Sequence, residues 1–197
     1  MFFDHHCRDP LAYRILGLEP KQTPTRRWYY LIPRTGEPQK LVHRIESLVL
    51  DRLPGEKLIY SSWTSQAESL GKLLSGRRRV AMQYSPNCAN FHVSMVDAGT
   101  VELVRSFGAE VVSSADLLQY FEARWSEDAL ESHQEAGRRV DEIRRLAFHF
   151  AGDRLRAGED VDEYGVQQYI RESFLKEGLV TDHGPIVAVN ENASDPN

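Results

Sequence analysis

The hydrophobic pattern of this 197-residue chain changes its period once, near residues 122–126, and this change limits the folds that the sequence can adopt. Before this point, short β-rich apolar runs alternate with segments of helical period, which predicts a layered α/β domain. After it, apolar residues recur at spacings of three and four, which predicts long helices. We therefore expect two domains, residues 1–125 and 126–197.

The first domain is expected to contain a mixed sheet with helices on both faces. A turn-forming segment from Pro33 to Pro38 separates two apolar runs, which predicts an antiparallel hairpin. Gly108 ends one predicted helix, and Ser113 or Ser114 caps the next. The predicted strands are 2–5, 27–32, 39–43, 57–60, 79–83 and 110–112, and the predicted helices are 11–16, 64–74, 100–107 and 115–121.

The second domain begins with one long predicted helix. Ser126 is a suitable N-cap, and the acidic Glu127 and Asp128 favour the positive end of the helix dipole. The helix runs to about residue 155 and carries one apolar stripe, formed by Ala136, Val140, Ile143, Ala147 and Phe150. A second helix follows, capped by Asp160 or Asp162 and closed by Gly178, with a buried face of Val166, Ile170 and Phe174.

The last apolar run, residues 186–189, is β-branched and predicts a buried strand. A buried strand needs neighbours for its backbone groups, and no later residue of this sequence can supply them. We therefore expect the chain to carry only the opening part of its second domain.

The amino-acid composition argues against several classes of function and partner. The formal charge is −5, so we expect no nucleic-acid partner, and the basic run Arg77–Arg79 is interpreted as a solvated strand entry. No apolar stretch approaches the ~20 residues of a membrane-spanning helix, so no membrane association is expected. Two cysteines do not make a disulfide framework, and no signal peptide follows Met1, so we expect a cytoplasmic protein.

The densest set of metal-ligating residue types is Asp4, His5, His6 and Cys7. Because neighbours on a strand point to opposite faces, His5 and His6 do not easily share one ion. The alternatives are a metal site and a strand end whose polar residues face solvent or a domain interface. The sequence contains no nucleophile elbow, phosphate-binding loop or dinucleotide-binding turn, so it gives no support for those activities.

Several segments resemble the creatinase, prolidase and Xaa-Pro aminopeptidase family of metallopeptidases. The likeness extends along almost the whole chain and is a general one, not a catalytic signature. The segments are RRWYYLIP (26–33), KLVHRIE (40–46), RVAMQYSP (79–86), VDAGTVELV (96–104), VVSSADL (111–117) and GLVTDHGPIVAVN (178–190).

The resemblance implies a creatinase-like amino-terminal α/β domain, clipped at its start, followed by a truncated pita-bread catalytic domain of α+β type. The family activity is metal-dependent hydrolysis of peptide bonds next to proline, with two divalent metals (Mn, Co or Zn) held by two Asp, one His and two Glu. These ligands lie downstream of the matched segments, so we expect this chain to have no metal site, no cofactor and no activity alone. A substrate-site histidine follows an Asp-Pro in relatives, but Asn197 occupies that position here.

The resemblance also implies a dimer, in which amino-terminal domains place side chains near the partner subunit's active site and restrict it to short proline-containing peptides. The candidate substrate-side residues are Arg8, Trp28, Tyr84 and Asn87, chosen as exposed aromatic, polar and charged groups near strand ends. The alternative for Trp28 and Tyr84 is a position in the core or at its rim. The alternatives are a non-catalytic dimerisation or interaction module, or pseudo-peptidase fragment, and a small-molecule-binding α/β protein or a creatinase-like relative without proteolytic activity.

Overall fold

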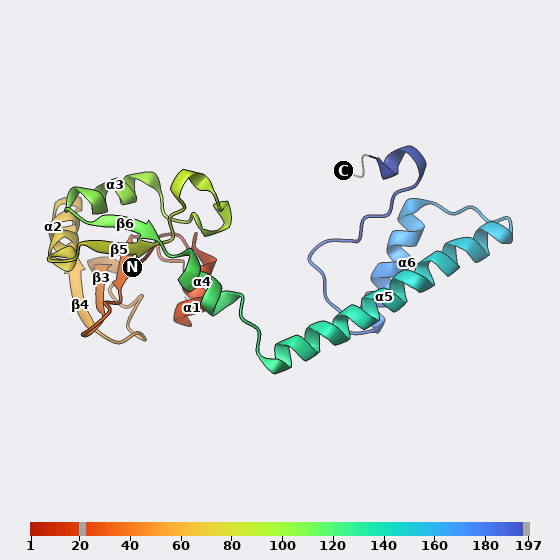
Figure 1. Cartoon of the computed structure of the whole chain (residues 1–197), viewed down its shortest axis with the longest axis horizontal. Helices are drawn as coiled ribbons and strands as arrows, with labels where there is room; N and C mark the ends of the chain where they lie inside the picture. The colour runs from red at the N-terminus through yellow and green to blue at the C-terminus, as the bar shows by residue number, and fades with distance from the viewer. Residues whose placement is uncertain (20–22, 195–197) are drawn as a thin grey trace. The chain divides into compact units, whose positions relative to one another are not determined.

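The computed structural model describes residues 1–19 and 23–194, which form two compact units, Met1–Arg124 and Trp125–Asn197 (Figure 1). The boundary falls one residue before the domain junction predicted from the sequence. The described residues contain six α-helices and a mixed sheet, so the predicted mixed α/β class is confirmed.

A four-stranded sheet forms the centre of the first unit. Its order is β1-β2-β3-β4, with antiparallel pairing between β1 and β2 and between β2 and β3, and parallel pairing between β3 and β4. The predicted hairpin is confirmed, with Tyr30 opposite Lys40. The strands are β1 (Phe2–Asp4), β2 (Trp28–Leu31), β3 (Gln39–His43) and β4 (Glu56–Tyr60).

The last two strands of the first unit form a sheet of their own. β5 (Arg79–Met82) and β6 (Glu110–Ser113) pair in parallel, with Val80 opposite Val111. The helix between them, α3 (Ala98–Ser106), makes the crossover that a parallel pair requires.

Alternation along the strands gives the four-stranded sheet two buried faces. Tyr29 and Leu31 join one core, to which α2 (Trp63–Leu74), α3 and the β5–β6 pair contribute. Trp28 and Tyr30 join a second core with residues of α1 (Pro10–Leu16). Helices therefore cover both faces of the sheet, as the sequence pattern predicts.

Polar side chains set the starts of these helices. Ser62 forms a capping box with Ser65 at the start of α2. Asp97 accepts a hydrogen bond from the Thr100 N–H at 2.8 Å, so α3 begins two residues earlier than predicted. Helix α4 (Ala115–Glu122) follows Ser114 and packs beside α1.

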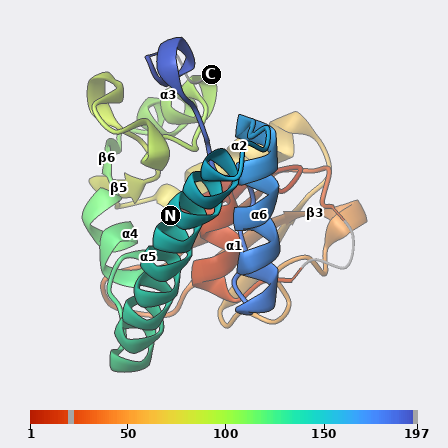
Figure 2. The ribbon, with the colours of Figure 1, turned by 90° about the vertical axis from the view of Figure 1, so that its right-hand side faces the viewer.

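The second unit is built on two helices that lie side by side, α5 (Glu127–Arg156) and α6 (Glu163–Lys176) (Figures 1 and 2). Ser126 caps α5, as predicted, and Asp162 caps α6. Ile143 and Ala147 of the predicted stripe are buried. The ring of Phe150 stacks on Tyr169 of α6 with a centroid distance of 4.4 Å.

The prediction of a buried strand at residues 186–189 is wrong. This segment is irregular, and Ile186 is 66% exposed. No strand of the described part of the second unit lies beside it, so its β-branched residues have no ladder to join. Instead, the Val189 N–H donates to Oε1 of Glu163 at 2.7 Å, and a 3₁₀ turn, Asn190–Ala193, follows.

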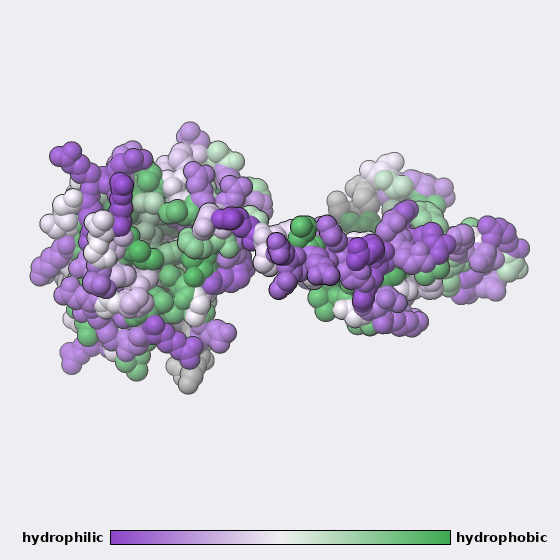
Figure 3. Space-filling model, turned by 60° about the horizontal axis from the view of Figure 1, so that its bottom comes forward, coloured by the Kyte–Doolittle hydropathy of each residue, from purple (hydrophilic) through white to green (hydrophobic). Residues whose placement is uncertain are grey.

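Hydrophobic side chains gather in patches among hydrophilic ones on the visible face of the first unit (Figure 3). Across the described residues, no helix combines the length and the apolar character that crossing a bilayer requires. The predicted cytoplasmic location stays a prediction.

Candidate functional site

The four residues selected from the sequence lie at different depths in the first unit. Arg8 is exposed between β1 and α1, Tyr84 is half-buried just after β5, and Asn87 is exposed in a 3₁₀ turn, Pro86–Cys88. Trp28 is 1% exposed, so its selection as an exposed aromatic is wrong. It belongs to a buried strand and packs against Tyr13 of α1, with the rings edge to face. Whether any of the four contacts substrate stays a prediction.

A buried polar cluster lies between the segments that carry these candidates. Asp4, at the end of β1, is 2% exposed, and its Oδ1 accepts hydrogen bonds from the backbone N–H groups of Arg8 (2.9 Å) and Asp9 (3.1 Å). Its Oδ2 accepts from the hydroxyl of Tyr13 at 2.9 Å. The Trp28 indole N–H donates in turn to the Tyr13 oxygen at 3.3 Å. The Asp4 carboxylate thus fixes the turn that carries Arg8.

Asp9 extends this cluster to the end of β5. As the N-cap of α1, its Oδ1 accepts from the Ala12 N–H at 3.0 Å, and it also accepts from Nε2 of Gln83 at 2.7 Å. The Gln83 carbonyl accepts hydrogen bonds from the N–H groups of Met95 and Val96. Asp9 and Gln83 therefore join the segment after Arg8 to the loop that contains Tyr84 and Asn87.

One oxygen of this cluster is orphaned. Oδ2 of Asp9 is buried and has no hydrogen-bond partner among the described residues. Burial raises the pKa of Asp9, while the hydrogen bonds from Ala12 and Gln83 oppose that shift. Burial also raises the pKa of Tyr13, which keeps its hydroxyl protonated as the donor to Asp4. The hydrogen bonds of the cluster therefore fix two loops to each other.

The residues at the end of β1 do not form a metal centre. β1 ends at Asp4, and His6 and Cys7 have left-handed backbone conformations with φ of 60° and 53°, so the chain turns away from the strand. Burial, followed by the charge of Arg8, lowers the pKa of His5. Within residues 1–19 and 23–194, no three His, Cys, Asp or Glu side chains are placed to hold an ion together.

A surface recess of about 490 Å³ lies beside this cluster, on the Tyr13 side of the second core. Glu46 lines it and accepts hydrogen bonds from the backbone N–H groups of Thr25 (2.9 Å) and Arg26 (2.8 Å). These bonds occupy both carboxylate oxygens. Burial acts to raise the pKa of Glu46, but the hydrogen bonds from Thr25 and Arg26 act against it, and the pKa is lowered. Ile45 and Leu48 are exposed at its rim. The recess therefore offers apolar contact and one engaged carboxylate.

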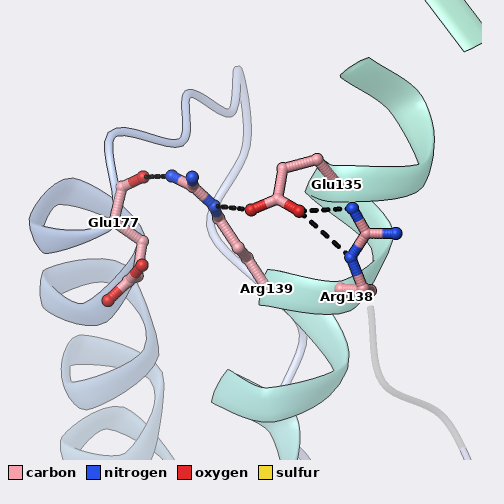
Figure 4. Close-up of polar contacts among 4 residues, drawn as sticks. All are labelled: Glu135, Arg138, Arg139 and Glu177. Carbon is pink, nitrogen blue, oxygen red and sulfur yellow. Dashed lines mark hydrogen bonds and ion pairs between the residues drawn. The ribbon is translucent and has the colours of Figure 1, made fainter. Parts of the chain in front are cut away.

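The second unit carries a polar contact between its two helices (Figure 4). Glu135 binds both Arg138 and Arg139, and Nη1 of Arg139 donates to the backbone carbonyl of Glu177 at 2.6 Å. The hydrogen bonds from the two arginines lower the pKa of Glu135. Arg139 therefore satisfies a carbonyl at the end of α6 that the helix itself leaves free.

No family model matches this chain, and no curated protein matches it either. The likeness to the creatinase, prolidase and Xaa-Pro aminopeptidase family therefore stays a prediction made from the sequence. The position predicted to replace a substrate-site histidine, Asn197, lies outside the described residues.

The sequence pattern does not predict the buried cluster, although part of its signal is present. Asp9 followed by Pro10 is a recognisable helix start, since Asp is a preferred N-cap and Pro is favoured at the first helical position. Nothing in the local sequence marks Gln83 as its partner, because the two residues are 74 positions apart.

Proposed function

We propose that this chain is the amino-terminal portion of an Xaa-Pro-type metallopeptidase, with a creatinase-like first domain, and that it supplies structure and substrate-side groups, not metal ligands. The observation that carries the proposal is the order of its parts. A mixed-sheet α/β unit is followed at Trp125 by two helices. The resemblance implies such a unit followed by helix, helix and strand, and the described residues have this order except for the last strand. The reaction of the parent enzyme would be hydrolysis of a peptide bond next to proline.

The described side chains do not fit the two metal ions that such a reaction uses, because they form no convergent group of three ligands. We therefore assign no metal-assisted step to this chain. When bound to a parent enzyme, the metals would lower the pKa of a shared water.

Within this proposal, the Asp9–Gln83 hydrogen bond has a positioning role. It holds together the turn of Arg8 and the loop of Tyr84 and Asn87, which are the three candidates near the surface. The guanidinium carbon of Arg105 lies 5.1 Å from the centroid of the Tyr84 ring, which restricts that ring. A short peptide held in a neighbouring subunit would meet these groups from outside.

The experiment that tests the proposal is a peptidase assay in two forms. The purified chain is incubated with Xaa-Pro peptides and with Mn²⁺, Co²⁺ or Zn²⁺, and the same assay is run on the product of the reading frame extended past Asn197. We expect cleavage by the extended product only, with an Ala-Ala peptide as the uncleaved control. Metal-dependent cleavage by the 197-residue chain alone would contradict the assignment, as would an extended product that cleaves none of these peptides.

A second candidate is a non-catalytic interaction module, favoured by the large apolar side chains that the second unit exposes. Phe148, Leu155 and Leu175 on its helices and Val180 and Ile186 after them are all more than half exposed. A surface of this kind is typical of a protein that is covered by a partner or by further chain. Stable self-association without any cleavage by the extended product would favour this candidate.

A further inference from the structure

One side of α5 carries a continuous series of residues at alternating spacings of four and three. The series has eight members, of which seven are exposed, and the eighth, Ala151, is half-buried. Phe148 lies roughly 140° around the helix axis from Ile143, which packs in the core of this unit, at 3.6 residues per turn. We call this series the α5 seam: Leu130, Gln134, Gly137, Asp141, Arg144, Phe148, Ala151 and Leu155.

The spacing of the α5 seam is the a/d pattern of a two-helix coiled coil. Unlike a typical coiled coil, the α5 seam has leucines at its two ends and an ion pair in its middle. Asp141 and Arg144 bind each other within the helix, with Nη2 and Oδ1 2.8 Å apart. No side chain of the described second unit covers Phe148, which is 72% exposed.

The α5 seam matches its own reverse at three of its four residue pairs; the fourth pairs Gln134 with Ala151. About the midpoint between Glu142 and Ile143, Leu130 is symmetric with Leu155, and Gly137 is symmetric with Phe148. The same operation relates Asp141 to Arg144. An antiparallel second copy would thus place leucine against leucine, the bulky phenyl ring over a glycine, and acid against base.

A parallel second copy would not fit. In-register parallel helices bring each seam residue against itself, so Asp141 would face Asp141 and Arg144 would face Arg144. Such like-charge contacts across an interface cost several kcal/mol. Antiparallel pairing replaces them with two ion pairs around one twofold axis, which is an isologous contact.

The charge along the whole helix favours the same arrangement. Residues 127–137 contain four carboxylates and no lysine or arginine, whereas residues 143–156 contain four arginines and one aspartate. Antiparallel helices place the acidic half of each against the basic half of the other. Arg138 and Arg145 would approach each other on one flank, but Glu135 and Glu142 already bind them.

We propose that the α5 seam binds a second copy of this chain as an antiparallel helix pair, with Asp141 and Arg144 fixing its register. Polar residues at core positions of a helix pair are a known device for fixing register and orientation. This pairing does not depend on the proposed peptidase relationship, since it involves only residues of α5.

Charge reversal tests the register of the pair. The variants Asp141→Arg and Arg144→Asp each place like charges at both central contacts, so each alone should have a dimer dissociation constant at least about 100-fold higher than that of the unchanged chain. Mixed together, the two variants restore opposite charges and should form a heterodimer. Sedimentation equilibrium over a range of concentrations measures all four samples.

The matched control is Asp153→Arg. This variant makes the same charge change on the same helix and also breaks an i, i+3 ion pair, with Arg156, but it lies off the α5 seam. It should self-associate like the unchanged chain. A monomeric unchanged chain, a dimer that Asp141→Arg leaves intact, or a mixture that fails to pair would each overturn the proposal.

Cross-linking tests the orientation. In a Cys88→Ser background, Leu130→Cys and Leu155→Cys are prepared as separate chains and oxidised with copper-phenanthroline. Antiparallel pairing brings residue 130 of one copy to residue 155 of the other, whereas the two copies of residue 130 lie ~37 Å apart at 1.5 Å per residue. The mixture should cross-link faster than either variant alone, and faster cross-linking of Leu130→Cys with itself would overturn the antiparallel arrangement.

Discussion

Oδ1 of Asp9 accepts a hydrogen bond of 2.7 Å from Nε2 of Gln83, and both residues are buried. This contact joins the start of α1 to the end of β5 across 74 residues of sequence. It is a buried polar connection between the turn of Arg8 and the loop of Tyr84.

Replacing Asp9 should separate its acceptor role from its charge. Asp9→Ala removes the cap of α1 and leaves the buried Gln83 amide without its partner, so we expect a loss of about 2–4 kcal/mol in the free energy of unfolding. Asp9→Asn keeps an acceptor oxygen and removes the charge, so its stability should lie within about 1 kcal/mol of the unchanged chain. Urea unfolding monitored by tryptophan fluorescence measures both. An alanine variant as stable as the asparagine variant would contradict the assigned role.

The same residue predicts a pH dependence. Burial raises the pKa of Asp9 above its ordinary 3.8, so the folded chain holds this proton to a higher pH than the unfolded chain does. The contribution of Asp9 to stability is complete below 3.8 and is lost as pH rises through the raised value. The stability of the unchanged chain minus that of Asp9→Asn should therefore fall as pH rises across this window. A difference that is flat with pH, or that rises, would contradict the raised pKa.

Removing the Tyr13 hydroxyl should cost more than removing a comparable hydroxyl elsewhere. Tyr13→Phe leaves Oδ2 of Asp4 and the Trp28 indole N–H without their partner in the second core, which we expect to lower the free energy of unfolding by about 1–3 kcal/mol. Tyr60→Phe is the matched control, because its hydroxyl makes one hydrogen bond, to the carbonyl of Arg27. Chemical denaturation of the two variants side by side gives the comparison, and equal losses would count against a shared network.

Two turn glycines provide a test of the backbone. Gly55 has φ of +103°, and a Cβ there would lie 2.1 Å from the carbonyl oxygen of Pro38. Gly36 has φ of +95° with nothing within 4 Å of the same position. We expect Gly36→Ala to cost about 1–2 kcal/mol, the ordinary penalty of a left-handed conformation, and Gly55→Ala to cost at least about 3 kcal/mol. Thermal unfolding followed by circular dichroism measures both, and similar midpoints would contradict the close approach at Gly55.

Local sequence signals predict those parts of the fold that depend on interactions between residues close in the sequence. The hairpin of β2 and β3 follows from two apolar runs and a turn, and Ser126 begins α5 because its hydroxyl can accept from the Ala129 N–H. The strand prediction for residues 186–189 is wrong because a strand depends on a neighbour that is not local in the sequence. These β-branched residues form a strand only beside another strand. Here the Val189 N–H donates instead to the Glu163 carboxylate.

The candidate site is harder to predict from the sequence than the fold. Trp28 is a candidate because it is an aromatic near a strand end, but its strand is buried on both faces and Tyr13 accepts its N–H. Gln83 carries no local mark of its role, since its partner Asp9 is 74 positions away in the sequence. Sequence patterns identify caps and periods, whereas pairings between distant segments depend on the packed structure.

The most direct test of the central claim is to read the coding sequence on the 3′ side of the Asn197 codon. The proposal predicts an in-frame continuation that carries two Asp, one His and two Glu, the ligand set of a dinuclear metallopeptidase. A stop codon directly after Asn197, or a continuation without these ligands, would contradict the assignment of this chain to the front of such an enzyme.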